Sequence, residues 1–328
     1  MTRKINNSYE LGQSNAPTDG GDMLKTRADG TLVWEGVADT TFVPFHFHNA
    51  SNYGFSAGGN GSEDVIDRFA FSSNTTATDW GDLTQILPST SGQSSSTDGF
   101  ASGGDSYNVI NKFSFTSSSG ASDHGDLTME RPYPVGQSSS DYGFASGGEP
   151  SARTDRIDRF AYSSNTTATD WGNLTQARML MAGQSSSDYG FTSGGNDAGT
   201  KFNIIDKFSF ASTGDATDHG DLSVARNGGA GQSSSDYGFT SGGNTGSNTN
   251  TIDKFAWSSN TTATEHGDLS VARRYAGGQS SSTEGFTSGG YISSTVDTID
   301  KFSIASNTTA SDHGDLSVVK WGFSGSQY

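Results

Sequence analysis

Aromatic residues alternate with small and polar ones along most of the chain, in short runs that end at glycine pairs or polar turns. In one such run, Tyr237 and Phe239 lie on either side of a glycine, so both rings fall on the same face of a strand. The pair Gly242 and Gly243 ends this strand, because glycine adopts backbone conformations that a side chain forbids. Residues 252–257 repeat the alternation, and a polar Asn-Thr-Thr turn follows them. The pattern predicts short antiparallel strands joined by tight turns.

This unit occurs six times. The copies align on a Gly-Phe dipeptide, which stands at Gly54-Phe55, Gly99-Phe100, Gly143-Phe144, Gly190-Phe191, Gly238-Phe239 and Gly285-Phe286. Their spacing, about 44 to 48 residues, is the length of a β-propeller blade. Blades stack face to face around an axis, and each needs its neighbours to bury its aromatic rings. We therefore expect an all-β fold in which residues 45–328 form a six-bladed β-propeller and residues 1–44 form a separate N-terminal segment.

The two ends of the repeat region compete for one strand position. Residues 322–328 stand where each later unit begins, and residues 45–52 hold the corresponding place in the first unit. One of the two segments is expected to complete the sheet shared by the first and last blades. The sequence leaves open which of them does so.

Composition supports a fold rich in turns and narrows the function. The 328 residues include 44 glycines, 20 phenylalanines and 11 tyrosines, although only 30% are hydrophobic. A net charge of -17 without any run of Lys or Arg disfavours contact with nucleic acid. The lack of cysteine excludes disulfides, Cys-based zinc sites and thiol nucleophiles. Because no apolar segment is long enough, we expect neither an ordinary signal peptide nor membrane insertion.

The order of aromatic strand, Gly-Gly, variable loop, aromatic strand, polar turn and closing arginine resembles the kelch repeat. The Gly-Gly element is present in all six units, at Gly58-Gly59, Gly103-Gly104, Gly147-Gly148, Gly194-Gly195, Gly242-Gly243 and Gly289-Gly290. The tryptophan that the kelch pattern places before its last strand is present only as Trp80 and Trp171. The resemblance implies a kelch-like propeller but no particular function, since kelch proteins have many roles.

The residues of the repeats are also similar to those of virion-associated proteins in marine tailed bacteriophages. The similarity rests on the segments Gly-Gln-Ser-Ser-Ser, Tyr-Gly-Phe-Thr-Ser-Gly-Gly, Ile-Asp-Arg-Phe and Gly-Asp-Leu-Thr. Residues 21–35 look like the short attachment segments of phage fibre and appendage proteins. This resemblance implies a non-enzymatic structural protein of the virion, assembled in the host cytoplasm, that serves host attachment as a tail fibre, a receptor-binding protein or another capsid or tail appendage.

On that interpretation, residues 1–44 bind other virion proteins. Residues 28–31 are expected to form a turn between two short apolar runs, and Leu24, Leu32 and Trp34 supply the apolar contacts of the anchor. The alternative is that this segment packs against the edge of the propeller. A homo-oligomer is compatible with both interpretations and required by neither.

Equivalent positions in the six units separate structural chemistry from functional chemistry. The position before the last strand holds tryptophan in two units and His124, His219, His266 or His313 in the other four. Tryptophan cannot act as a metal ligand or general base, so we expect a packing role for this position, with metal binding or acid-base chemistry by the histidines as the alternative.

Aspartate recurs at two further positions, each of which holds asparagine once. The two sets are Asp67, Asp158, Asp206, Asp253 and Asp300 with Asn111, and Asp82, Asp126, Asp221, Asp268 and Asp315 with Asn173. Asp and Asn share the ability to accept backbone N–H bonds in turns, which predicts that role. The residues that close the units are expected to pair with these carboxylates between blades: Arg131, Arg178, Arg226, Arg273 and Lys320.

Candidate catalytic residues recur in every unit, whereas a catalytic site breaks symmetry, so we expect no enzyme activity and no cofactor. Calcium binding by the repeated carboxylates stays open, although the spacing of an EF-hand is missing. His46 and His48 form a His-x-His pair, which puts both imidazoles on one strand face and makes them a minor candidate metal site. The alternative is an exposed pair of side chains near the anchor.

Function is expected where the copies differ, which is in the loops after Gly-Gly and in the loops after the closing arginine. The second set holds the aromatic, arginine and methionine side chains that are typical of contact surfaces. Its candidate binding residues are Tyr133, Met179, Met181, Arg274, Tyr275, Trp321 and Phe323. The alternative is that these loops vary by neutral drift and pack one blade against the next. The expected partner is a host surface glycan or protein. Two other functions stay open: a cellular protein-interaction or glycan-binding kelch propeller, and a glycan-active enzyme.

Overall fold

The computed structural model describes residues 22–26, 32–36, 52–60 and 64–327. The chain divides into two compact units, Met1–Phe45 and His46–Tyr328. All regular elements of the described residues are β-strands. The predicted all-β class is therefore confirmed.

The first unit contains an antiparallel pair of strands, β1 (Asp22–Thr26) and β2 (Leu32–Gly36), in which Leu24 stands opposite Trp34. The two apolar runs predicted to flank a turn thus form paired strands. The turn itself, residues 28–31, lies outside the described residues, as do His46 and His48.

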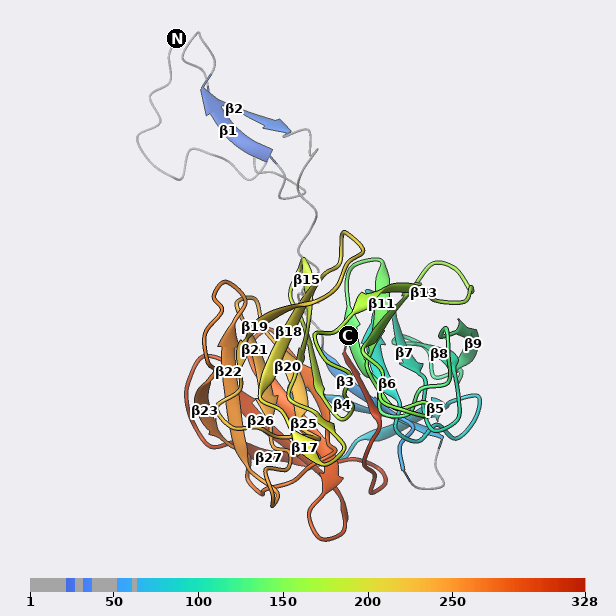
Figure 1. The fold of residues 1–328 in the computed structure, drawn as a ribbon. Coiled ribbons are helices and arrows are strands. Elements are labelled where there is room, and N and C mark those ends of the chain that lie inside the picture. Colours follow the sequence, from blue (N-terminus) through green and yellow to red (C-terminus); the bar gives the residue numbers. More distant parts are fainter. Residues whose placement is uncertain (1–21, 27–31, 37–51, 61–63, 328) are drawn as a thin grey trace, which may run out of the picture. The chain divides into compact units, whose positions relative to one another are not determined.

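The second unit is a propeller of six four-stranded antiparallel sheets, as predicted (Figure 1). The inner strands of blades 1 to 6 are β28 (Ser324–Gln327), β6 (Ser91–Ser94), β10 (Val135–Ser138), β14 (Ala182–Ser185), β20 (Ala230–Ser233) and β24 (Gly277–Ser280). The second strands are β3 (Tyr53–Ala57), β7 (Asp98–Ser102), β11 (Tyr142–Ser146), β15 (Tyr189–Ser193), β21 (Tyr237–Ser241) and β25 (Glu284–Tyr291).

The third strands are β4 (Val65–Ala70), β8 (Val109–Ser114), β12 (Arg156–Ala161), β18 (Ile204–Ser209), β22 (Thr251–Ala256) and β26 (Thr295–Ser303). The outer strands are β5 (Thr78–Asp82), β9 (Ser122–Asp126), β13 (Thr169–Asn173), β19 (Thr217–Asp221), β23 (Thr264–Asp268) and β27 (Ser311–Asp315). A small hairpin of β16 (Asn196–Asp197) and β17 (Thr200–Lys201) lies in the loop between β15 and β18.

The C-terminal strand closes the ring. β28 pairs with β3, with Ser324 opposite Ala57 and Gln327 opposite Gly54, so it supplies the inner strand of blade 1. Each inner strand carries one glycine against the neighbouring inner strand: Gly92, Gly136, Gly183, Gly231, Gly278 and Gly325. A Cβ at any of them would lie 2.0 to 2.4 Å from a neighbouring glycine carbonyl oxygen. Residues 45–52 contain no glycine, which explains why residues 322–328 fill this position instead.

Aromatic rings fill the spaces between blades. Phe144 of β11 is fully buried and stacks on Phe210 of the next blade at 4.8 Å between ring centres, with Phe208 edge-on at 5.5 Å. The second strand of every blade holds an equivalent buried phenylalanine: Phe55, Phe100, Phe191, Phe239 and Phe286. Each ring is covered by the next blade, so no blade buries its core alone.

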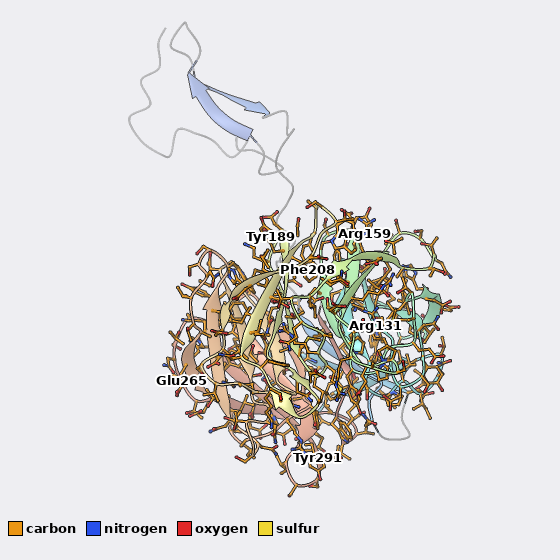
Figure 2. The ribbon with its side chains drawn as sticks, in the orientation of Figure 1. Arg131, Arg159, Tyr189, Phe208, Glu265 and Tyr291 are labelled. Carbon is orange, nitrogen blue, oxygen red and sulfur yellow. The ribbon has the colours of Figure 1, made fainter. Side chains whose placement is uncertain are left out.

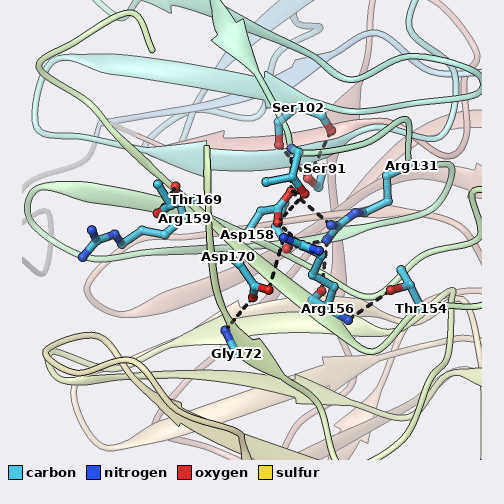
Figure 3. A network of polar contacts seen from close by, with 12 residues as sticks. Ser91, Ser102, Arg131, Thr154, Arg156, Asp158, Arg159, Thr169, Asp170 and Gly172 are labelled. Carbon is cyan, nitrogen blue, oxygen red and sulfur yellow. Dashed lines mark hydrogen bonds and ion pairs between the residues drawn. The ribbon is translucent and has the colours of Figure 1, made fainter. Parts of the chain in front are cut away.

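A buried ion pair fastens five of the blades to the next one. Between blades 2 and 3, Arg131 Nη2 lies 3.0 Å from Asp158 Oδ2, and neither side chain is exposed (Figure 3). The same carboxylate accepts the backbone N–H of Thr128 at 2.9 Å. Equivalent pairs join Arg178 to Asp206, Arg226 to Asp253, Arg273 to Asp300 and Lys320 to Asp67, at 2.8 to 3.1 Å. The predicted pairing between blades and the turn role of this aspartate position are both confirmed.

The second aspartate position contributes through its main chain. The carbonyl of Asp126 accepts the N–H of Ala168 in the next blade at 2.7 Å. The bond that holds the adjacent turn comes from Asp123, whose Oδ1 accepts the N–H of Gly125 at 2.8 Å. The turn bond expected from this position is therefore made by the side chain three residues earlier.

The histidine position is structural, as predicted. His124 Nε2 lies 2.9 Å from the carbonyl oxygen of Ala161 in the next blade, and Trp80 Nε1 donates to the carbonyl of Ser114 at 2.8 Å. A carbonyl oxygen only accepts, so the imidazole carries its proton on Nε2 and makes the same bond as the indole. His124 also packs edge-on against Phe100 at 5.1 Å.

A glutamine forms a third link between blades. Gln93 Nε2 in β6 donates to the carbonyl of Phe144 in blade 3 at 2.9 Å. Equivalent bonds of 2.9 to 3.1 Å come from Gln137, Gln184, Gln232 and Gln279. In β28 this position is Ser326, whose shorter side chain donates to the carbonyl of Gln93 at 3.2 Å.

Candidate functional site

The two variable sets of loops lie at the same end of the propeller. The first set connects second to third strands, and the second set, residues 83–90, 127–134, 174–181, 222–229, 269–276 and 316–323, connects each outer strand to the next inner strand. In every blade the residue after Gly-Gly donates its N–H to a carbonyl in the second set, for example Tyr291 to Arg274 at 2.8 Å and Glu149 to Pro132 at 2.9 Å. We call this end of the propeller, formed by both sets, the loop face.

A ring of left-handed residues surrounds the axis on the loop face. The six equivalent residues have φ between 56° and 68°: Ser89, Tyr133, Leu180, Gly228, Tyr275 and Gly322. Backbone hydrogen bonds join neighbours in the ring, as from Tyr275 N to Gly228 O at 2.7 Å and from Gly322 N to Tyr275 O at 2.9 Å. Two positions are glycine, which adopts this conformation without cost. Tyr133, Leu180 and Tyr275 keep bulky side chains there, and such strained residues cluster at functional sites.

The ring encloses a cavity of about 130 Å³ on the axis. Its lining extends from the left-handed ring inward to the glycines of the inner strands, such as Gly136 and Gly231. The volume suffices for several water molecules but is smaller than the roughly 300–1,000 Å³ of a typical ligand pocket. A ligand larger than a few atoms must therefore rest partly on the surrounding loop face.

Five of the seven predicted binding residues line this cavity: Tyr133, Met181, Tyr275, Trp321 and Phe323. Met181 and Phe323 are only 6% exposed and pack into the cores between blades, so they support the cavity from beneath. Met179 and Arg274 each precede a residue of the left-handed ring, and their carbonyls bond to the first set of loops. The sequence prediction did not select Leu180 or Tyr291, although their alignment with Tyr133 and with the loop after Gly-Gly was available.

The side chains around the mouth differ from one sector to another. In one sector, burial raises the pKa of Tyr133, and a hydrogen bond with Ser89 partly offsets this effect. The nearby charges of Asp105 and Glu149 raise this pKa further, so the phenol remains a neutral donor at physiological pH. In the other sector, the ring centres of Tyr275 and Trp321 lie 5.2 Å apart, and the Arg274 guanidinium lies 5.0 Å from the centre of Tyr275.

Figure 2 shows that Tyr291 of the loop face and Tyr189 lie at opposite ends of the propeller. Tyr189, at the start of β15, belongs to the repeated hairpins. Its ring lies 4.0 Å from Lys207 Nζ, an intrablade contact that recurs between Tyr237 and Lys254 at 4.8 Å. Variation is therefore concentrated at the Tyr291 end.

The part of the chain that the structure describes holds no cluster of three or more His, Asp or Glu side chains placed to bind a metal ion. In the same residues, no helix is long and apolar enough to cross a membrane. No protein-family model matches the chain, and no curated protein matches it.

Proposed function

We propose that this chain is a non-enzymatic recognition module whose loop face binds a partner, and that it serves as a bacteriophage virion protein, either a tail fibre, a receptor-binding protein or a capsid or tail appendage. One observation carries the proposal of recognition. The side chains that differ among six otherwise similar blades gather at one axial mouth, where Tyr133, Leu180 and Tyr275 occupy strained backbone positions.

The internal chemistry of the blades supports a non-enzymatic role. The buried histidines hold neighbouring strands through carbonyl bonds, as His219 does with Ala256 at 2.9 Å. The buried arginines are neutralised by aspartates, as Arg178 is by Asp206 at 3.0 Å. These groups already have structural partners, and the same arrangement recurs around the ring, whereas a catalytic site requires one distinct set of residues.

Exposed apolar side chains support contact through the loop face. Within the described residues, five of seven exposed large hydrophobic side chains belong to its connections: Ile86, Tyr107, Val224, Val271 and Val319. Exposures of 40% to 52% leave these side chains available to a partner.

The virion setting rests on the similarity of the repeats and of residues 21–35 to phage appendage proteins. We propose that residues 1–44, with Leu24, Leu32 and Trp34, attach the propeller to other virion proteins. The separate pair of strands β1 and β2 supports an independent attachment element. The alternative setting is a cellular kelch-like propeller that binds a protein or glycan through the same loop face.

Two variants of the full chain test both parts of this proposal. Deletion of residues 1–44 is expected to abolish incorporation into phage particles, seen by cryo-electron microscopy, while binding of the purified protein to host cells persists. Tyr133→Ala combined with Leu180→Ala is expected to leave incorporation intact and to abolish cell binding. Normal incorporation after the deletion would favour the cellular alternative, and normal cell binding by the double variant would exclude Tyr133 and Leu180 as contact residues.

A further inference from the structure

Arg274 is a cation on the loop face that has no carboxylate partner among the described residues. Its position, directly after the closing residue of a blade, holds an uncharged residue in the other five connections: Pro88, Pro132, Met179, Asn227 and Trp321. Among the described residues, no carboxylate lies within salt-bridge distance of Arg274, and its guanidinium makes one long hydrogen bond, to Asn248 Oδ1 at 3.4 Å. Arg153, on the same face, is paired with Glu149 at 3.0 Å and Asp197 at 3.3 Å.

The guanidinium of Arg274 is held in place although no carboxylate in the described part of the chain pairs with it. It lies 5.0 Å from the centre of the Tyr275 ring and 5.2 Å from that of Tyr291. Asn248 Nδ2 donates to the carbonyls of Tyr291 at 3.1 Å and Ile292 at 2.9 Å, which orients its Oδ1 toward the arginine. Two aromatic rings and one amide thus fix the cation before any ligand arrives, which lowers the entropic cost of binding.

Aromatic rings continue from Arg274 to the mouth of the cavity. Trp321, which is half-buried, lies 5.2 Å from Tyr275 with a 32° angle between the ring planes, and 6.5 Å from Tyr291. The Tyr275 ring lies over Gly228, where a Cβ would fall 2.6 Å from it. Glycine in the neighbouring blade therefore makes the space that this tyrosine occupies.

The chemistry of this sector restricts the ligand. Flat aromatic surfaces accept the C–H face of a sugar ring, and a planar guanidinium binds a carboxylate through two parallel hydrogen bonds. A phosphate monoester carries almost two negative charges and is repelled more strongly by a protein of net charge -17. The cavity of about 130 Å³ also favours a small group over a protein segment.

We infer that Arg274, Tyr275, Tyr291 and Trp321 bind a pyranose ring that bears a single carboxylate, the ring stacked on the aromatic side chains and the carboxylate paired with the guanidinium. This inference rests on the recognition function proposed above and names its ligand class. It adds two residues to those that the sequence indicates: Asn248, from the loop after Gly-Gly in blade 5, and Tyr291, from the corresponding loop in blade 6.

The test compares sugars that differ only at C6. Binding of the methyl glycosides of glucuronic, galacturonic and mannuronic acid to the full chain is measured by saturation-transfer NMR titration, beside the matched neutral hexosides and glucose 6-phosphate. At least one uronide is expected to bind about tenfold more tightly than its neutral counterpart, since a charge-assisted hydrogen-bond pair is lost in the latter. The inference is overturned if uronides and neutral hexosides bind equally well or if glucose 6-phosphate binds more tightly. It is also overturned if no uronide binds with a dissociation constant below about 10 mM.

Variants then assign the preference to residues. Arg274→Gln is expected to remove the tenfold preference while weak binding of the neutral sugar persists, and Trp321→Ala to weaken both. Arg153→Gln is the matched control, since that arginine is already paired on the same face, and it is expected to keep the preference. A preference that survives in Arg274→Gln overturns the assignment.

The two proposals fail separately. Loss of cell binding in Tyr133→Ala with Leu180→Ala, without any uronide preference in the parent protein, would leave recognition standing and remove the acidic sugar. A uronide preference that depends on Arg274, in a protein that binds no cell or particle, would leave the acidic-sugar site standing and remove the proposed recognition function.

Discussion

Arg226 Nη2 lies 2.8 Å from Asp253 Oδ2, with both side chains buried between blades 4 and 5. Burial lowers the pKa of Arg226, and the Asp253 charge opposes that shift. At the boundary between blades 1 and 2, the corresponding positions are Leu87 and Asn111, both uncharged. Asn111 keeps the turn bond, accepting the N–H of Thr84 at 2.8 Å, as Asp253 accepts that of Ser223 at 2.9 Å. Both charges are replaced together, because one alone would be buried without a partner.

This relationship predicts a strongly coupled double-mutant cycle. Arg226→Leu alone should lower the free energy of unfolding by about 3–5 kcal/mol, because it strands a buried carboxylate. Arg226→Leu combined with Asp253→Asn copies the natural Leu87 and Asn111 arrangement, and should return to within about 1 kcal/mol of the parent. Chemical denaturation followed by fluorescence measures both. If the loss of unfolding free energy in the double variant equals the sum of the losses in Arg226→Leu and Asp253→Asn, the pair is not coupled.

Among the described residues, the blade 1–2 boundary lacks one of the three polar links found elsewhere, the buried ion pair, and has a bond from the shorter side chain of Ser326 to the inner strand of blade 2 in place of the glutamine link. Trp80, which donates to Ser114 at 2.8 Å, and Asn111, which accepts the N–H of Thr84 at 2.8 Å, keep the common arrangement. We predict that the ring opens first here, so that amides of β28 and β6 exchange with deuterium faster than those of other inner strands.

Two substitutions check the cause of that opening. Ser326→Gln should slow amide exchange in β28, because the longer side chain can reach the second strand of blade 2, whereas Ser326 reaches only the inner strand, at the carbonyl of Gln93. Gln232→Ser, which gives the blade 5–6 boundary the same shortened side chain, should accelerate exchange in β20 and β24. Uniform exchange across all six inner strands in the parent protein would show that the polar links do not set local stability.

Much of this architecture was predictable because equivalent positions of the six repeats can be compared within one chain. Tryptophan in place of histidine in two blades favoured the packing role that His124 has in the structure, and the repeated arginine and aspartate positions predicted their contact between blades. The closing strand was not predicted, because both ends of the repeat region were candidates and the close approach of the inner-strand glycines, which Gly325 satisfies, is visible only in the structure. The left-handed ring could not be predicted from the sequence, because four of its six residues are not glycine. Nor could the joining of the two loop sets, which depends on main-chain bonds between distant segments.

The buried histidines predict loss of stability in mild acid. Burial lowers the pKa of His219 and His266 below the ordinary value of 6.5, with hydrogen bonds to Ala256 and Ser303 partly opposing the shift. The unfolded chain therefore binds protons first as the pH falls, so their contribution to stability is complete above pH 6.5 and is lost as the pH falls through the lower folded pKa. Thermal unfolding between pH 7.5 and 5 should show a falling melting temperature.

The chain supplies its own control for this effect. His219→Trp with His266→Trp copies Trp80 and Trp171, whose indole nitrogens make the equivalent bond. The double variant should fold and should lose less stability over the same pH interval, because two of the titrating groups are gone. An unchanged slope of melting temperature against pH would assign the acid sensitivity to other groups.

The left-handed ring predicts an inverted effect of glycine. At Tyr133, where φ is 56°, alanine and glycine remove the same phenol, but only alanine retains the conformational cost of a side chain. Tyr133→Gly should therefore be up to about 1 kcal/mol more stable than Tyr133→Ala, the left-handed cost of about 1–2 kcal/mol outweighing the usual entropic penalty of glycine. At Val271, on the same face with an ordinary φ, glycine should instead be the less stable of the two. Both Tyr133 variants should bind the partner weakly, since both lack the ring. If the alanine and glycine variants have the same order of stability at Tyr133 and at Val271, the backbone at Tyr133 is unstrained. The bulky side chains of the ring then need no functional explanation.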